Sequence, residues 1–200
     1  MEHGTQSFWS RCTFEPKWNG MHEARLSVGH YPATAEMISN APKVLRLQLE
    51  KTNISTLPNW FLSPGDGCVD EEFKDLIQSL EPDLHTFIPM EVLDQNNKSY
   101  GTRFMHYVHH FADTLDFERT RFRKDFGWEA GKSCGFDFSF DNDMNPTIVM
   151  DAKKAKHRHF WRNTYETGVS EFFCSDRVAD FIRDKNPQWD FKPMTYSDDD

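Results

Sequence analysis

The chain has 200 residues, 38% of them hydrophobic, and its 18 Phe, 6 Trp and 5 Tyr can fill an aromatic core without disulfide bonds, as one domain or two closely packed halves. Its 32 Asp and Glu outnumber its 23 Lys and Arg, and the net charge of −9 opposes binding to nucleic-acid phosphates or anionic membranes and favours a basic partner. Since no stretch approaches the roughly 20 apolar residues of a membrane span, and residues 1–11 contain no apolar signal-peptide segment, we expect a soluble cytoplasmic protein.

Two segments of the chain, 42–90 and 146–194, resemble each other. Each opens with an apolar run that is typical of a strand, Val44–Leu49 in the first segment and Thr147–Met150 in the second. These runs predict that each segment begins with a buried strand.

A helix is predicted next in each segment. The first helix has Asp70 as a candidate N-cap, acidic residues in its first turn and apolar residues at helical spacing, and Pro82 follows its end. The second has Ser175 as a candidate cap, and Pro187 lies beyond its end. Asp75 and Asp180 are therefore predicted to occupy equivalent positions in the two helices.

Each segment is then predicted to end on a short strand with the pattern Phe-x-Pro-Met, at Phe87–Met90 and at Phe191–Met194. Any two αβ units share caps and apolar faces, but the common ending favours an internal duplication. We therefore predict an α+β fold in which two related αβ units surround a mixed or antiparallel sheet, with a charged insertion between them.

Between the two units, a strand-like run at Phe104–Phe111 precedes a polar stretch at 112–145. This stretch has a basic cluster near its start and acidic residues near its end, and we interpret it as an exposed insertion that can carry function, although such runs are more often solvated faces. We predict a single domain. In chain order its parts are an N-terminal segment at 1–40, a first αβ unit at 42–90, the polar insertion at 112–145, a second αβ unit at 146–194 and a disordered acidic tail at 197–200.

The best lead to catalysis is Asp151-Ala152-Lys153, which follows the predicted strand. Metal-dependent nucleases hold Mg²⁺ on carboxylates and place a lysine beside the attacked phosphate, so Asp137 or Asp141 would act with Asp151 and Lys153. An acid-x-Lys sequence also arises wherever a buried strand reaches solvent, and the charge of −9 leaves no basic groove for DNA. A metal-dependent nuclease is therefore the alternative function.

Histidines and cysteines give weaker leads. On a helix His106, His110 and Asp113 would share one face and could hold a transition metal, but the aromatic-rich run around them favours a strand, which turns His109 away. The four cysteines are far apart with no C-x-x-C pair, so we expect thiols in a reducing cytosol. They are Cys12, Cys68, Cys134 and Cys174. We predict no bound metal, no cofactor and no catalytic residue.

The second unit contains several short blocks in a fixed order. They are Ile148–Lys154, His157–Arg162, Phe172–Val178 and Trp189–Met194. In this order they resemble a bacterial immunity-protein family, formerly a domain of unknown function, that is encoded beside polymorphic toxins. Members of that family show a strand, a His-aromatic-Arg block, a Ser-Asp pair that opens a helix and a final aromatic-x-Pro strand. The resemblance is clearest from residue 146 onward and weaker from Trp60 to Phe111.

The resemblance implies a non-enzymatic protein that binds a cognate toxin stoichiometrically in the producing cell. Its motifs are structural, because Ser175-Asp176 looks like a helix cap and His159–Arg162 looks like packing. The insertion belongs to neither unit, so its residues are freer to carry specificity. We therefore predict that Asp137, Asp141 and Asp143 face the basic groove of a nucleic-acid-degrading toxin, with Trp128 as an apolar anchor.

Overall fold

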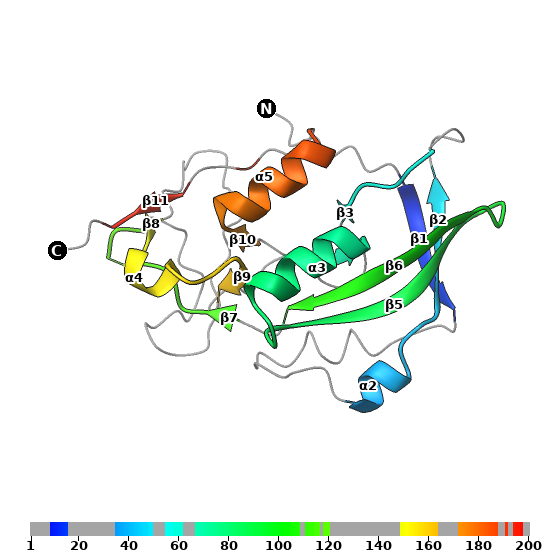
Figure 1. Ribbon diagram of the computed structural model, residues 1–200, viewed down its shortest axis with the longest axis horizontal. Coiled ribbons are helices and arrows are strands. Elements are labelled where there is room, and N and C mark those ends of the chain that lie inside the picture. The colour runs from blue at the N-terminus through cyan, green and yellow to red at the C-terminus, as the bar shows by residue number, and fades with distance from the viewer. Residues whose placement is uncertain are drawn as a thin grey trace, which may run out of the picture. The chain divides into compact units, whose positions relative to one another are not determined.

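The computed structural model shows a mixed α+β protein, which confirms the predicted fold class (Figure 1). The chain divides into two compact units: unit 1 comprises Met1–His109 and Ala179–Asp190, and unit 2 comprises His110–Val178 and Phe191–Asp200. Across the described residues, no helix is long and apolar enough to cross a membrane. The structure describes residues 9–15, 35–49, 55–61, 67–108, 111–116, 118–120, 149–163, 172–187, 191 and 194–197.

Unit 1 contains a six-stranded sheet in the order β1-β2-β5-β6-β4-β3. The parallel pair β2 and β5 makes the sheet mixed, since all the other neighbours are antiparallel. Its centre is the long β5–β6 hairpin, drawn in green in Figure 1. The strands are β1 (Trp9–Glu15), β2 (Val44–Leu49), β3 (Trp60–Phe61), β4 (Gly67–Val69), β5 (His85–Asp94) and β6 (Ser99–Val108).

One face of this sheet carries the apolar core of unit 1. Alternate residues of each strand point to this face, as the period of two in an extended chain requires. An apolar face is stable only when it is covered. Its burial therefore determines which side of each strand faces the core. The buried members are Ala41, Leu45, Leu47, Leu49, Leu57, Phe61, Cys68, Ile88, Met90, Val92 and Met105.

The other face of β5 and β6 carries helix α3 (Glu71–Leu80). As predicted, the Asp70 carboxylate caps this helix by accepting a hydrogen bond of 2.8 Å from the backbone N–H of Phe73. The helix buries Phe73 and Ile77. It ends where Glu81 donates its N–H to Ile77, just before the predicted stop at Pro82.

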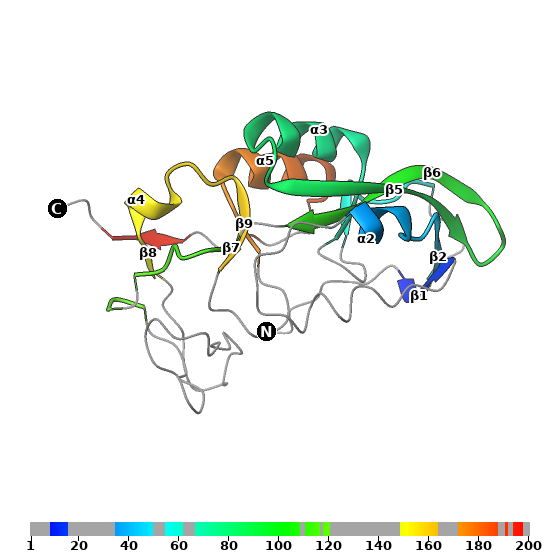
Figure 2. The ribbon, with the colours of Figure 1, turned by 90° about the horizontal axis from the view of Figure 1, so that it is seen from below.

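Two further helices belong to this part of the chain. The short helix α2 covers Ala35–Ser39, and α5 covers Asp176–Lys185, with its residues from Ala179 onward in unit 1. The rings of Phe73 and Phe181 lie 6.2 Å apart, so this portion of α5 packs beside α3 (Figure 2). Helices α3 and α5 were predicted from the sequence, and each has ten residues, whereas α2 was not predicted.

Unit 2 is built from short elements. Its three-stranded sheet has the order β10-β9-β7, and a separate parallel pair joins β11 to β8. Its core consists of Ala112, Leu115, Met150, Ala155, Trp161 and Phe173, with Met194 packed against them. The elements are β7 (Phe111–Ala112), β8 (Val149–Met150), α4 (Ala152–Ala155), β9 (Phe160–Asn163), β10 (Phe173–Cys174) and β11 (Thr195–Tyr196).

The predicted duplication agrees with the structure in its opening strands and helices, but the closing strands differ. Phe87–Met90 lies inside β5, whereas Phe191 and Met194 lie outside any strand. The prediction of a strand at Phe191–Met194 is wrong at these two residues, because pairing with β8 begins only at Thr195. Lys192 and Pro193 lie outside the described residues.

The start of the predicted polar insertion contributes to the core of unit 2. Thr114 and Leu115 are buried, and the hydroxyl of Thr114 accepts a 3.0 Å hydrogen bond from the indole N–H of Trp161. Thr120 is also buried, and its hydroxyl bonds the backbone of β8. Residues 121–148 lie outside the described part of the chain.

Candidate functional site

The residues predicted to face a partner are not among those that the structure describes. The acidic group and its apolar anchor all fall between residues 121 and 148. They are Asp137, Asp141, Asp143 and Trp128. Their role in partner binding therefore stays a prediction.

Asp151, in the best lead to a nuclease, directly follows a strand as expected, but Lys153 does not lie on a strand. Strand β8 stops at Met150, and Asp151 is the N-cap of the short helix α4. One oxygen of its carboxylate, Oδ1, accepts the backbone N–H groups of Lys153 and Lys154 at 3.0 and 3.1 Å. Lys153 consequently lies on a helix, and the carboxylate serves a structural cap, so this geometry does not support the nuclease alternative.

The other charged groups beside this cap form surface ion pairs. The Lys154 ammonium lies 3.2 Å from Asp113 Oδ2 and 3.9 Å from Asp151 Oδ2. These side chains are 31–45% exposed, so each pair contributes little to stability. In the part of the chain that is described, no three His, Cys, Asp or Glu side chains are grouped so that they could hold a metal ion.

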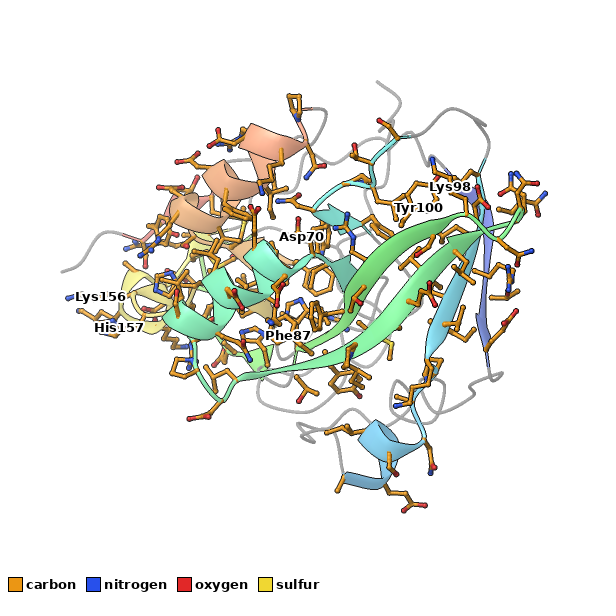
Figure 3. All side chains as sticks on the ribbon, turned by 45° about the vertical axis from the view of Figure 1, so that its right-hand side comes forward. Asp70, Phe87, Lys98, Tyr100, Lys156 and His157 are labelled. Carbon is orange, nitrogen blue, oxygen red and sulfur yellow. The ribbon has the colours of Figure 1, made fainter. Side chains whose placement is uncertain are left out.

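His106 lies on strand β6, as the sequence predicted, and it belongs to a buried polar chain. Its Nε2 lies 2.9 Å from Nδ1 of His85, and Nε2 of His85 lies 3.0 Å from the Glu81 carboxylate. An ionised carboxylate only accepts hydrogen bonds, so His85 donates to Glu81 and accepts from His106. The ring of His106 also stacks on Phe87, with centroids 4.7 Å apart (Figure 3).

This buried chain joins the end of α3 to both central strands. The side chains of His85 and Glu81 are 1% and 3% exposed, and His106 is fully buried. A substrate in solution therefore does not reach them, and their hydrogen bonds serve to satisfy groups that would be costly to bury alone. The sequence indicated His106 but gave no sign of its partners, because strand pairing brings them together. His109 and His110 lie outside the described residues.

The thiols of Cys68 and Cys174 are not joined in disulfides, as predicted. Cys174 lies in β10, next to Ser175, whose hydroxyl is 3.0 Å from Nδ1 of His159. Ser175 directly precedes α5, as predicted, and its carbonyl accepts the N–H of Val178. Ser175 and His159 thus hold β9, β10 and the start of α5 together, which agrees with the packing role that the resemblance implied for His159.

The turn of the β5–β6 hairpin is an exposed feature of unit 1 that several hydrogen bonds hold. The Asp94 side chain accepts the backbone N–H groups of Asn96 and Lys98 at 2.7 and 2.9 Å. Asn97 adopts a φ of +65°, a left-handed conformation that asparagine tolerates better than most residues. The Lys98 ammonium lies 4.7 Å from the centre of the Tyr100 ring (Figure 3). Residues 95–99 are all exposed.

Strand β2 holds this turn from the side. The Arg46 guanidinium donates to the Asp94 carbonyl at 3.2 Å and to the Asn97 side-chain oxygen at 2.9 Å. It also donates to Glu15 at 2.9 Å, and this hydrogen bond holds the pKa of Glu15 below its usual value and raises the pKa of Arg46. The Gln95 amide, in turn, accepts the N–H of Leu49 at 2.9 Å.

Comparison with known protein families identifies the chain. A model of an immunity protein family, Imm11, matches residues 11–196. The chain belongs to the Imm11 immunity protein family. A comparison with curated proteins finds no match. The Imm11 match confirms the resemblance seen in the sequence and extends it from the second unit to nearly the whole chain.

Membership of Imm11 indicates an immunity role and implies a toxin as the partner. Such a role requires an accessible binding surface. In the described part of this Imm11 protein, the polar chain of Glu81, His85 and His106 is sealed from solvent, whereas the hairpin turn at residues 95–99 is exposed and fixed in shape.

Proposed function

We propose that this Imm11 protein binds a cognate toxin tightly and stoichiometrically, and that it neutralises the toxin without catalysis. The proteins meet in the cytoplasm of the bacterial cell that makes the toxin, as part of a polymorphic toxin system. The observation that carries the proposal is the Imm11 match over residues 11–196. Neutralisation follows when the bound protein covers the toxin's active site or blocks a motion that the toxin needs.

The positions and the burial of the polar side chains in the described residues support binding over catalysis. The residues of the acid-x-Lys lead cap and form helix α4, and the histidine chain under α3 is buried. Catalysis requires a group within hydrogen-bond reach of a substrate, directly or through one water. The predicted acidic cluster of Asp137, Asp141 and Asp143 is proposed to contact the toxin.

A titration tests the proposal. The toxin encoded by the gene beside this one is expressed as its isolated toxic domain, and its activity is measured with increasing amounts of the purified protein. Stoichiometric neutralisation predicts a linear fall to no activity at one equivalent, together with a 1:1 complex on size-exclusion chromatography. Full toxin activity in the presence of excess protein would contradict the proposal.

The same titration separates binding from an enzymatic mechanism, because an enzyme would abolish toxin activity at far less than one equivalent. A direct assay addresses the nuclease alternative. The purified protein is incubated with DNA and RNA in Mg²⁺ or Mn²⁺. We expect no cleavage, whereas cleavage that is lost in a folded Asp151→Ala variant would establish the nuclease.

A further inference from the structure

The tip of the β5–β6 hairpin, defined as residues 95–99, combines exposure with a fixed shape. All five residues are exposed. Exposed loop tips usually sample several conformations, because few contacts restrain them. Here the Asp94 carboxylate, which is buried with its residue only 5% exposed, binds two backbone N–H groups of the tip.

Restraint also comes from a second strand. Arg46 of β2 binds the Asp94 carbonyl and the Asn97 side chain, and Gln95 reaches back to both backbone groups of Leu49. These contacts join residues about fifty positions apart in the sequence, so β2 must pair with the hairpin before the tip takes this shape. The entropy of ordering the tip is therefore lost on folding and is not lost again when a partner binds.

The tip presents one positive charge. Lys98 is the sole charged residue between 95 and 102, in a protein whose net charge is −9. Its ammonium lies over the Tyr100 ring, which orients the charge and leaves it at the surface. Tyrosine and cationic side chains on a rigid support are typical of the residues that dominate protein interfaces.

The hydrogen bonds of Arg46 and Asp94 could serve only to fix the register of β2, β5 and β6. That role would not require any particular residue at Asn96 or Lys98. Both residues are exposed, and the Lys98 ammonium lies over the Tyr100 ring (Figure 3). We propose that the hairpin tip inserts into an acidic recess of the cognate toxin, with Lys98 meeting a carboxylate there. This inference rests on the proposed function, since it names the surface through which the toxin is bound.

Two single variants test it. Lys98→Glu reverses the charge, and Asn96→Tyr adds bulk that a recess cannot accept. Both variants keep the two hydrogen bonds of the Asp94 carboxylate, because these use the backbone N–H groups of residues 96 and 98. Matched controls make the same changes at exposed positions outside the hairpin, as Lys156→Glu and Asn40→Tyr.

Affinity for an inactivated form of the neighbouring toxin is measured by isothermal titration calorimetry, and thermal unfolding confirms that every variant is folded. We expect each tip variant to weaken binding by about thirtyfold or more, as loss of a central contact does, and each control to bind as the wild type does. Lys98→Arg should restore most of the affinity.

The outcomes separate the two proposals. If the wild type binds and the tip variants bind equally well, the hairpin inference is overturned and the proposed function stands. Weakening by the controls as much as by the tip variants would also overturn it, because the effect would then be general. If the wild type does not bind the toxin at all, the proposed function itself fails.

Discussion

The hydroxyl of Thr120 bonds both backbone groups of Val149, since it donates to the carbonyl at 3.1 Å and accepts from the N–H at 3.0 Å. The N–H of Asp116 donates to the same carbonyl at 2.9 Å. Asp116 and Thr120 therefore act as a substitute neighbour for the two-residue strand β8. A side chain thus supplies the pairing that a longer strand would provide.

Replacement of Thr120 by valine should destabilise unit 2 markedly. The change keeps the branched shape but removes the hydroxyl. The N–H and the carbonyl of Val149 therefore each lose one buried hydrogen-bond partner. We expect the free energy of unfolding to fall by about 1–3 kcal/mol, measured by urea denaturation. Thr120→Ser keeps the hydroxyl and should cost clearly less. A valine variant that is as stable as the wild type, or that loses less stability than the serine variant, would contradict this account of the hydrogen bonds.

Glu81 should be needed as a hydrogen-bond acceptor. Glu81→Leu leaves the Nε2–H of His85 buried without this acceptor, which costs about 1–3 kcal/mol of unfolding free energy. Glu81→Gln retains an amide oxygen and should cost less. Chemical denaturation at one fixed pH checks both, and a leucine variant as stable as the wild type would contradict this account of the buried chain.

The Glu15–Arg46 pair gives a pH-dependent prediction. The hydrogen bond from Arg46 lowers the pKa of Glu15 from its ordinary value of 4.5, so the stabilising contribution is complete above that value. It is lost as the pH falls through the lowered pKa, because protonation removes the negative charge. The ¹³C shift of the Glu15 carboxyl should titrate below pH 4.5 in the wild type and return towards 4.5 in Arg46→Ala. An unchanged midpoint in that variant would exclude Arg46 as the cause.

The acidic cluster should control association with the toxin. Replacing Asp137, Asp141 and Asp143 together by asparagine removes three charges, which should slow association and flatten its dependence on salt. Stopped-flow kinetics across a salt series measures both. The matched control neutralises three exposed acids on the helices, namely Asp75, Asp180 and Asp184. If the cluster variant keeps the wild-type rates and salt dependence, the interface lies elsewhere.

Local signals in the sequence predicted helices α3 and α5, whereas the short helices α2 and α4 were not predicted. Asp70 followed by acids and spaced apolar residues is a pattern that depends only on the chain within a few positions, and α3 forms there with the expected cap. Strand β2 and helix α5 were likewise predicted from patterns that span only a few residues. The length of β5 could not be predicted in this way. Its motif covers four residues, but pairing with β6 extends the strand to His85–Asp94.

The candidate sites depended more strongly on distant pairing. His106 contacts His85 because β5 and β6 place Phe87 opposite His106, a register that no local pattern specifies. The hairpin tip likewise depends on Arg46, which precedes Asn97 by 51 residues. Side chains brought together by sheet register are invisible to motif analysis, whereas caps and turns are not.

The part of α5 that belongs to unit 1 lies near the end of the chain, and this position affects the folding of unit 1 during synthesis. Phe73 packs against Phe181, and the buried Asn186 bonds Asn59. At typical rates of synthesis, the residues between Phe73 and Phe181 take about 5–20 s to add. During that time the ribosome-bound chain exposes the apolar side of α3 that α5 later covers. Truncation before Ala179 would fix the protein in this incomplete state, a form suited to capture by chaperones.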